Sequence, residues 1–340
     1  MKALKFVEPK RFEYIEMDVP RIEENQLRIK IKVAGICHSD VLSYAGKHPY
    51  RIPPVVTGHE FCGVVDEVGK NAFGDFHVGD RVVVEPHIGC GVCYYCKSGH
   101  YNLCVDKRLI GVKDWTGCFA EYVAVFPSMC FHMPYSMSYE EGALFEPYCV
   151  GQHAVEMANL PAGSSVAVLG CGTIGMMTIT SAFNHEMGII IGTDVSEYKC
   201  NFAINQGAIA MFNPIKDNIA AEILKMTNGV GVDCVFIDVS VPNILDQAFQ
   251  ICRKNGTIVI VASFDEPVKI DLKNICQRHV MGSNMYTAED YKQAMKQFQS
   301  GKLCLKLLVT RQISFLDAGT MIHDIAEGKF GDEIKIVIKF

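Results

Sequence analysis

Four cysteines in one short segment are arranged as a metal site. They are Cys90, Cys93, Cys96 and Cys104, with a C-x2-C-x2-C-x7-C spacing. That spacing lets four thiolates converge on one tetrahedral point, an arrangement typical of zinc or an iron–sulfur cluster. A closed, all-thiolate site leaves no position for a substrate. The segment therefore predicts a structural metal lobe at about residues 88–106.

A second set of candidate ligands mixes sulfur, nitrogen and oxygen: Cys37, His59, Glu60 and Glu146. A mixed site with room for water is typical of catalytic zinc. One thiolate, one neutral histidine and one carboxylate balance the charge of Zn²⁺, and a second carboxylate would weaken its pull on a substrate oxygen. We therefore expect one of the two glutamates to bind the metal directly. The other would hold the metal-bound water or contact the ligands without binding the metal. The sequence leaves open which one binds.

Such a site indicates alcohol chemistry. Zinc acidifies a bound hydroxyl, and hydride can then leave to a nicotinamide ring held in the cleft between two domains. Ser39, two residues after Cys37, is the candidate acceptor of the alcohol proton. Each residue alone has an ordinary structural explanation, as a core cysteine, a hydrogen-bonded histidine, a helix cap or a surface acid. The combination favours the catalytic interpretation.

A glycine-rich turn, Gly170-Cys-Gly-Thr-Ile-Gly175, follows a predicted strand and opens a predicted helix. In a dinucleotide site, the first glycine makes the turn, the second admits the pyrophosphate and the third lets the helix pack closely. The helix N-terminus then presents N–H groups to the anion. The predicted cofactor contacts are Gly170, Gly172, Thr173, Ile174, Gly175, Asp194 and Lys199.

Asp194 ends the next predicted strand and favours NAD over NADP. Its carboxylate can accept hydrogen bonds from the adenosine ribose and repels a 2′-phosphate. Lys199 is a nearby cation that could tolerate that phosphate. The alternative is a turn without a ligand, in which Asp194 serves as a helix N-cap.

The elements that position these groups follow two patterns. The N-terminal part is β-rich, with strands predicted at Leu27–Val33, Cys62–Gly69 and Arg81–Pro86. After Pro147, a helix at Val150–Asn159 begins an α/β pattern that predicts a doubly wound parallel sheet. Its strands are predicted at Val166–Leu169, Ile189–Thr193, Cys234–Val239 and Thr257–Ala262. Its helices are predicted at Thr173–Phe183, Glu197–Gln206, Ile219–Thr227 and Asn243–Lys254, the last ending at Asn255-Gly256. A helix at Glu289–Ser300 and a strand at Ile334–Phe340 complete the chain.

Composition limits the partners. The 340 residues allow two domains, and the formal net charge of −6 without a basic run argues against nucleic acid or an anionic membrane. The N-terminus lacks the apolar core of a signal peptide, and no segment is apolar for long enough to span a bilayer. Fifteen cysteines cannot all pair, which favours a reducing cytoplasm.

Together with the cysteine cluster, the segment Gly58-His-Glu-Phe-Cys-Gly-Val-Val-Asp-Glu-Val-Gly69 resembles the signature of the zinc-dependent medium-chain dehydrogenases. The resemblance implies a GroES-like catalytic domain at 1–148 and 283–340, enclosing a Rossmann NAD-binding domain at 149–282. It also implies two zinc ions per chain, one catalytic and one structural, and a homodimer or homotetramer.

Within that family, Phe145-Glu-Pro-Tyr-Cys-Val-Gly151 is similar to the polyol (sorbitol-type) branch, and so is Cys37-His-Ser-Asp40, with His38 in place of glycine. Leu42 stands where some members keep a relay histidine, and Asn284 lies where many sugar-handling relatives have an arginine nearby. Arg51 has two interpretations, as a partner for an acidic sugar or phosphate and as a solvated loop charge.

The leading functional hypothesis is a zinc enzyme that transfers hydride between NAD and a polyol, sugar alcohol or sugar acid. One alternative keeps the fold and acts on an amino-alcohol such as threonine, or on a simple alcohol. Another is a non-catalytic protein that senses NAD and uses the four-cysteine lobe for interaction.

Overall fold

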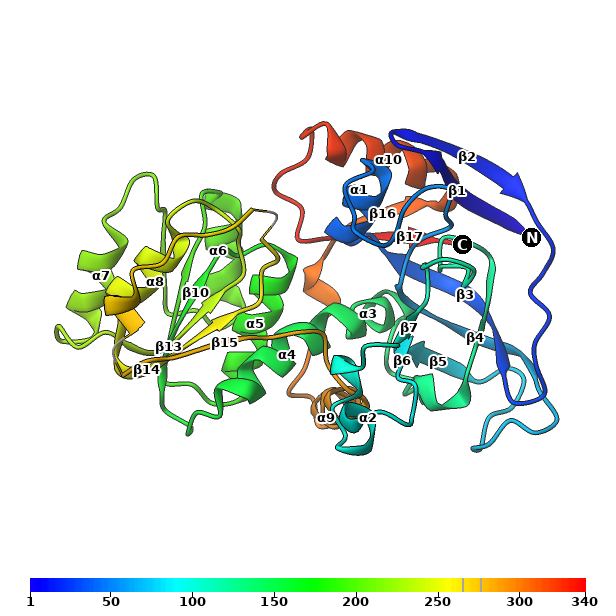
Figure 1. Cartoon of the computed structure of the whole chain (residues 1–340), viewed down its shortest axis with the longest axis horizontal. Helices are drawn as coiled ribbons and strands as arrows, with labels where there is room; N and C mark the ends of the chain where they lie inside the picture. The colour runs from blue at the N-terminus through cyan, green and yellow to red at the C-terminus, as the bar shows by residue number, and fades with distance from the viewer. Residues whose placement is uncertain (265, 276) are drawn as a thin grey trace. The chain divides into compact units, whose positions relative to one another are not determined.

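The computed structural model describes residues 1–264, 266–275 and 277–340. The chain forms two compact units, each labelled by element in Figure 1. The first unit comprises Met1–Glu146, Thr287–Gln299 and Cys304–Phe340, so both chain ends belong to it. The second comprises Pro147–Tyr286 and Ser300–Leu303. The boundary falls inside helix α4 (Phe145–Ala158), close to the predicted change of pattern at Pro147.

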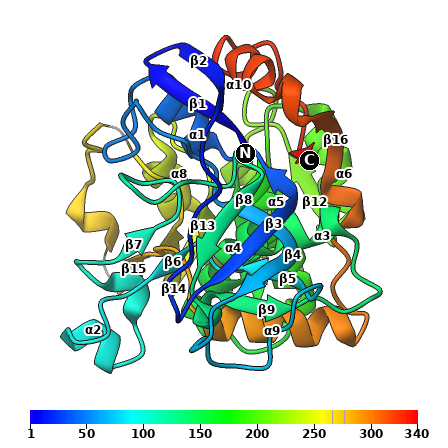
Figure 2. The same cartoon turned by 90° about the vertical axis from the view of Figure 1, so that its right-hand side faces the viewer.

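The first unit is built on a mixed sheet with the order β16-β17-β3-β4-β5-β9, and β8 also pairs with β3. The bounds are β3 Leu27–Gly35, β4 Glu60–Val68, β5 Arg81–Val84, β8 Tyr122–Val125, β9 Cys130–His132, β16 Val309–Ser314 and β17 Lys335–Lys339. Figure 2 shows β3, β4 and β5 side by side. Leu27, Ile29 and Ile31 of β3 are buried while Lys30 is exposed, which confirms the two-residue period.

The first unit has further elements besides this sheet. They are β1 Lys2–Glu8, β2 Arg11–Glu16, α1 His38–Tyr44, β6 His87–Ile88, α2 Tyr94–Lys97, β7 Arg108–Leu109, α3 Tyr139–Ala143, α9 Ala288–Gln299 and α10 Ala318–Ala326. Strands β1 and β2 form an antiparallel hairpin, and β6 pairs with β7 beside the cysteine segment. A large buried apolar cluster joins the sheet to several of these elements through side chains such as Phe6, Phe61, Phe119 and Ile338. The core of the first unit therefore fixes the ends of β3 and β4.

The second unit contains a parallel sheet with the order β12-β11-β10-β13-β14-β15. Its strands are β10 Ser165–Leu169, β11 Ile189–Thr193, β12 Ala210–Phe212, β13 Val232–Ile237, β14 Cys252–Ile260 and β15 His279–Gly282. Its helices after α4 are α5 Thr173–Asn184, α6 Glu197–Asn205, α7 Ile219–Met226 and α8 Ile244–Ile251. The strand order reverses between β10 and β13, the position where doubly wound sheets bind ligands. The expected α/β class is confirmed.

Two predicted helix boundaries are wrong. The helix expected from Val150 begins at Phe145, as α4. The helix expected at 243–254 ends at Ile251, and Cys252 already begins β14. Asn255, with φ of 59°, and Gly256 lie where the pairing of β14 with β13 shifts register. Asn-Gly tolerates a left-handed backbone in a bulged strand as well as at a helix end, so the dipeptide alone does not distinguish the two.

Over the part of the chain that the structure describes, no helix is both long enough and apolar enough to cross a bilayer.

Candidate metal and cofactor sites

The four cysteines of the lobe lie together. Their sulfur atoms fall within 4.8 Å of one another, and Cys90 Sγ lies 4.0 Å from Cys96 Sγ. Tetrahedral coordination with bonds of about 2.3 Å separates neighbouring sulfurs by ~3.8 Å. Gly89 makes the close approach feasible, because a Cβ there would lie 2.6 Å from Cys96 Sγ. The arrangement fits one structural zinc ion.

Backbone donors in the lobe favour thiolates. The N–H of Cys90 points to Cys104 Sγ at 3.3 Å, and the N–H of Cys96 points to Cys93 Sγ, the N-cap of α2, at 3.5 Å. Hydrogen bonds from the backbone of Val92 and Cys93 lower the pKa of Cys90 to about 7. Desolvation instead raises the pKa of Cys96 to about 12, so the four thiols lose their protons together only when a cation binds.

The mixed set comes from the adjacent ends of two strands. Cys37 follows β3 and is the N-cap of α1, whereas His59 directly precedes β4 and Glu60 begins it. Gly35 of β3 pairs with Glu60. The ligand atoms of Cys37, His59 and Glu60 lie within 4.8 Å of one another. Three of the four predicted ligands are thus brought together by the β3–β4 pairing.

Asp40 connects the two ligand segments from inside. Its Oδ2 accepts the N–H of Cys37 at 3.0 Å, and its Oδ1 accepts Thr57 Oγ1 at 2.8 Å and the N–H of Gly58 at 3.1 Å. Asp40 Oδ1 also lies 3.8 Å from His59 Nδ1. This fully buried carboxylate therefore fixes the backbone at Cys37 and at Gly58, the residue before His59, as outer partners of metal ligands commonly do.

Glu60 has an unexpected partner in Lys335 of β17. The two side chains form an ion pair, each 1% exposed, and Lys335 Nζ also donates to the carbonyl of Ile36 at 2.9 Å. Gly35 lies between them in the sheet, where a Cβ would be 2.1 Å from Glu60 Oε2 and 2.9 Å from Lys335 Cε. A glycine at this position leaves the space in which the two charges meet.

The donor set suits a divalent cation. Burial, with the charge of Glu60 adding to it, raises the pKa of Cys37 to about 12, so the thiol needs a cation to ionise. Burial also lowers the pKa of His59 well below its usual value, which keeps the ring neutral and able to coordinate. His59 Nδ1 is buried and has no hydrogen-bond partner. These properties fit zinc.

Glu146 and Ser39 lie close to this cluster without belonging to the three-ligand group. Glu146 is 7% exposed in the first turn of α4. Its charge adds a further contribution to the raised pKa of Cys37, which burial dominates, and to that of Lys335, in which Glu60 is the main raising cause. Ser39, in the first turn of α1, accepts a hydrogen bond from Arg51 Nη1 at 2.9 Å. Sequence reasoning gave no role to Asp40, although this residue ends the Cys37-His-Ser-Asp40 motif, and it missed Lys335, which no local pattern marks.

In the second unit, the glycine turn has the expected geometry. Gly170 adopts φ of 91°, and a Cβ on Gly175 would lie 1.9 Å from the carbonyl oxygen of Gly170, so the helix packs tightly on the turn. Gly172 is the N-cap of α5, and a Cβ there would meet nothing within 4 Å. Thr173 and Ile174 open the helix. The space in front of Gly172 is therefore open to a ligand.

Asp194 directly follows β11 and is hydrogen-bonded to the turn. Its Oδ2 accepts the N–H of Cys171 at 2.9 Å, and its Oδ1 accepts the N–H of Ser196 at 2.9 Å. The N-cap of α6 is Ser196, which accepts the N–H of Lys199 at 3.2 Å. The alternative role of Asp194 as N-cap is therefore wrong.

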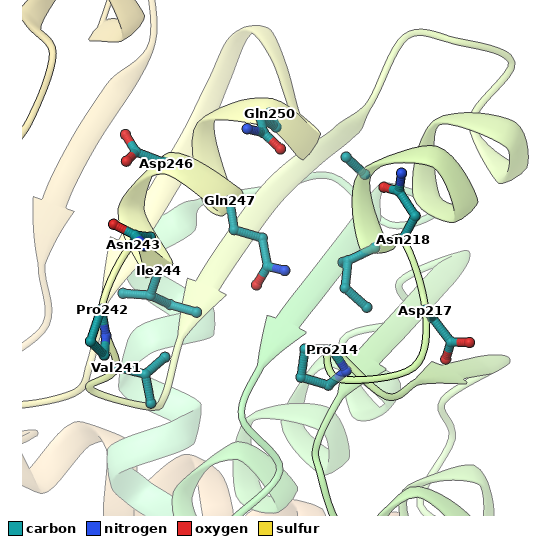
Figure 3. A pocket seen from close by; sticks show the side chains of 12 residues that line it. Pro214, Asp217, Asn218, Val241, Pro242, Asn243, Ile244, Asp246, Gln247 and Gln250 are labelled. Carbon is teal, nitrogen blue, oxygen red and sulfur yellow. The ribbon is translucent and has the colours of Figure 1, made fainter.

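A separate pocket of about 400 Å³ opens between the N-terminal parts of α7 and α8 (Figure 3). It is lined by Pro214, Asp217, Asn218, Ile219, Ala220, Val241, Pro242, Asn243, Ile244, Asp246, Gln247 and Gln250. None of the predicted cofactor contacts lines it. Its carboxylates, Asp217 and Asp246, make it unsuited to a phosphate.

Comparison with known proteins identifies the family. Residues 23–135 match the alcohol dehydrogenase GroES-like domain and residues 173–300 match the zinc-binding dehydrogenase domain. Sorbitol dehydrogenase of Bacillus subtilis (strain 168) is 33% identical over 320 residues, covering 92% of this chain and 90% of its own.

Two solved structures extend the likeness. A putative zinc-binding dehydrogenase from Sinorhizobium meliloti 1021, bound to NADP, has a TM-score of 0.93 and 29% identity, covering 100% of this chain and 99% of its own. Galactitol-1-phosphate dehydrogenase from Escherichia coli has a TM-score of 0.92 and 26% identity, with 100% of both chains covered. The expected resemblance is confirmed: the chain belongs to the zinc-dependent medium-chain dehydrogenases, oxidoreductases whose cofactors are zinc and a nicotinamide dinucleotide.

Proposed function

We propose that the protein is an NAD-dependent polyol dehydrogenase, which transfers hydride between a secondary alcohol and the nicotinamide. The observation that carries the proposal is the convergence of Cys37, His59 and Glu60 within 4.8 Å, in a chain that also has an open glycine turn. The likeness to sorbitol dehydrogenase supports a polyol as the substrate.

Cys37, His59 and Glu60 are proposed as the direct ligands of the catalytic zinc. Zinc supplies Lewis acidity, which lowers the pKa of an alcohol and polarises a carbonyl. Glu146 is the buried acid outside the three-ligand group, and we assign it to hydrogen bonding with a water or the substrate. The grouping of Glu60 with Cys37 and His59 supports this choice, and it agrees with charge counting, by which one direct carboxylate suffices.

Ser39 is proposed to accept the proton of the substrate hydroxyl. Its Oγ already accepts one hydrogen bond from Arg51, and a hydroxyl oxygen has a second lone pair for the alcohol. Asp40 would keep the backbone at Cys37 and at Gly58, the residue before His59, in place during turnover through its hydrogen bonds. Cys90, Cys93, Cys96 and Cys104 would hold a structural zinc that shapes the lobe.

NAD is proposed as the coenzyme. The turn from Gly170 to Gly175 and the N-terminus of α5 would hold the pyrophosphate, and the Asp194 carboxylate would accept the ribose hydroxyls. A 2′-phosphate would meet that carboxylate at close range, which disfavours NADP even with Lys199 in the first turn of α6.

The wider organisation is proposed on the same basis. We assign residues 1–148 and 283–340 to the catalytic domain and residues 149–282 to the NAD-binding domain. We expect a homodimer or homotetramer that works in the cytoplasm. The odd number of cysteines, 15, supports a reducing compartment.

The test is a substrate panel assayed with zinc-loaded protein and either NAD or NADP. The panel contains polyols, simple secondary alcohols and threonine, and NADH formation is followed by absorbance. We expect the polyols to give the highest kcat/KM with NAD. Faster oxidation of threonine or of a simple alcohol would favour those substrates instead. If no secondary alcohol is oxidised, the proposed function fails and a sensor of NAD becomes the better interpretation.

A further inference from the structure

Arg51 is a buried cation that is hydrogen-bonded to one face of helix α1. The residue is 4% exposed. Its backbone N–H donates to His48 Nδ1 at 3.1 Å, and its carbonyl accepts Ser43 Oγ at 2.6 Å. Its Nη1 donates to Ser39 Oγ at 2.9 Å. Ser39 and Ser43 are four residues apart on α1, so they lie on the same face of the helix. The interpretation of Arg51 as a solvated loop charge is therefore wrong.

The charge of Arg51 has no direct counter-ion. Among the described residues, no carboxylate oxygen lies within 4.0 Å of its guanidinium nitrogens, and its buried Nε has no hydrogen-bond partner. Burial raises the pKa of Asp40, and the charge of Arg51 offsets part of that rise, but the Asp40 oxygens already accept three hydrogen bonds from other groups. A buried guanidinium in this state is costly unless an anion joins it.

The position of the guanidinium tells where that anion would come from. Arg51 Nη1 donates a hydrogen bond to Ser39 Oγ, the proposed acceptor of the substrate proton. The Arg51 charge also lowers the pKa of the proposed ligand His59, so it lies within electrostatic reach of the metal ligands. A substrate whose hydroxyl contacts Ser39 would therefore place its neighbouring atoms beside Arg51.

Given the proposed function, on which this step rests, we propose that Arg51 binds an oxyanion carried by the substrate close to the carbon that is oxidised. The planar fork of a guanidinium matches a carboxylate or a phosphate, and charge-assisted hydrogen bonds to either are stronger than bonds to a neutral hydroxyl. The preferred substrate class is thus a sugar acid or a polyol phosphate, rather than a neutral polyol.

The experiment measures binding to the zinc-loaded protein saturated with NADH, in which no alcohol is oxidised. Titration calorimetry compares sorbitol, gluconate and sorbitol 6-phosphate. Loss of a hydrogen bond between two charged groups typically changes affinity by about 10- to 100-fold. We expect wild-type protein to bind at least one of the two anions more tightly than sorbitol by such a factor, and the preferred anion identifies carboxylate or phosphate.

Three variants locate the effect. Arg51→Gln should lose the preference for the anion, and Arg51→Lys should keep part of it, because the charge remains while the fork is lost. Lys47→Gln removes an exposed charge four residues away and should leave the preference intact. Equal affinities for all three ligands in wild-type protein, or an anion preference that survives in Arg51→Gln, would overturn the inference.

A parallel turnover assay separates the two proposals. Oxidation of sorbitol with no advantage for either anion would leave the proposed function standing and refute the role of Arg51. Oxidation of none of the three compounds, together with failure of the wider alcohol panel, would refute the proposed function itself. If Arg51→Gln does not fold, the wild-type comparison and Arg51→Lys still decide the question.

Discussion

Replacement of Lys335 by methionine tests how the first unit tolerates the buried charge of Glu60. Both side chains are 1% exposed, and Lys335 is the ion-pair partner of Glu60. Removing one member of a buried ion pair leaves an uncompensated charge, which typically costs about 3–5 kcal/mol. Methionine keeps most of the volume and the flexible stem. We therefore expect the free energy of unfolding of the first unit to fall by about 3–5 kcal/mol at pH 7.

The chain offers a direct probe and a matched control for this measurement. Trp115 is the only tryptophan, and it lies in the apolar core of the first unit, where its Nε1 donates to the carbonyl of Ala124 at 2.8 Å. Its fluorescence during urea unfolding reports on that unit, with chelator present in every sample to keep the metal state equal. Lys339 lies on the same strand as Lys335 and is the half-exposed ion-pair partner of Glu140. Lys339→Met should therefore lower the free energy of unfolding by less than about 1 kcal/mol.

A double variant completes the cycle. Glu60→Gln combined with Lys335→Met removes both charges and should recover most of the lost stability, because the uncompensated carboxylate is gone. If Lys335→Met is no more destabilising than Lys339→Met, the buried pair does not hold the end of β4 as we argue. Failure of the double variant to recover stability would contradict the same reasoning.

Three further predictions concern the other sites. Wild-type protein should contain two zinc ions per chain by elemental analysis. Cys37→Ser should lose one zinc ion and all turnover while staying folded, whereas Cys96→Ser should lose the other zinc ion and part of the homo-oligomeric assembly. Equal effects of the two variants would contradict the division into a catalytic and a structural site. Gly175→Ala should destabilise the second unit in calorimetry by about 3 kcal/mol or more, since its Cβ would lie 1.9 Å from a backbone oxygen, whereas Gly172→Ala should leave stability nearly unchanged and weaken NAD binding by fluorescence titration; the reverse order would refute the assigned roles. Burial raises the pKa of Asp238 to about 8, so the folded state holds this proton more tightly than the unfolded state. The stability that the neutral carboxyl contributes is therefore lost as pH rises from about 4 to 8. Calorimetry should show a smaller loss in Asp238→Asn, and a pH profile of stability identical to that of wild type would contradict this prediction.

The sequence predicted the strands and three side chains that converge because both are local patterns. Cys37 and the pair His59-Glu60 lie at the ends of strands that alternate clearly, so their approach follows once β3 and β4 pair. The glycine turn was equally accessible, because three glycines, a strand and a helix in register leave few alternatives. The candidate metal ligands and the candidate cofactor turn were thus recognisable in short segments of the sequence.

Long-range contacts were not visible in this way. Lys335 reaches Glu60 only because β17 pairs with β3 and β3 pairs with β4, with Gly35 leaving room between them. An alternating C-terminal strand gives no sign that its first lysine faces inward. The burial of Arg51 depends on Ser39 and Ser43 of α1, a short helix whose seven residues lack a distinct apolar period. The end of α8 was misplaced because Asn-Gly fits two backbone contexts.

The most direct test of the account is to locate zinc in the active protein. A crystal structure of zinc-loaded protein, with anomalous diffraction measured at the zinc edge, should contain two zinc peaks in each chain. One peak should lie among the four lobe cysteines, and the other should lie about 2.3 Å from Cys37 Sγ and about 2.0–2.1 Å from a ring nitrogen of His59. Fully active crystals with zinc in the lobe alone would contradict the central claim.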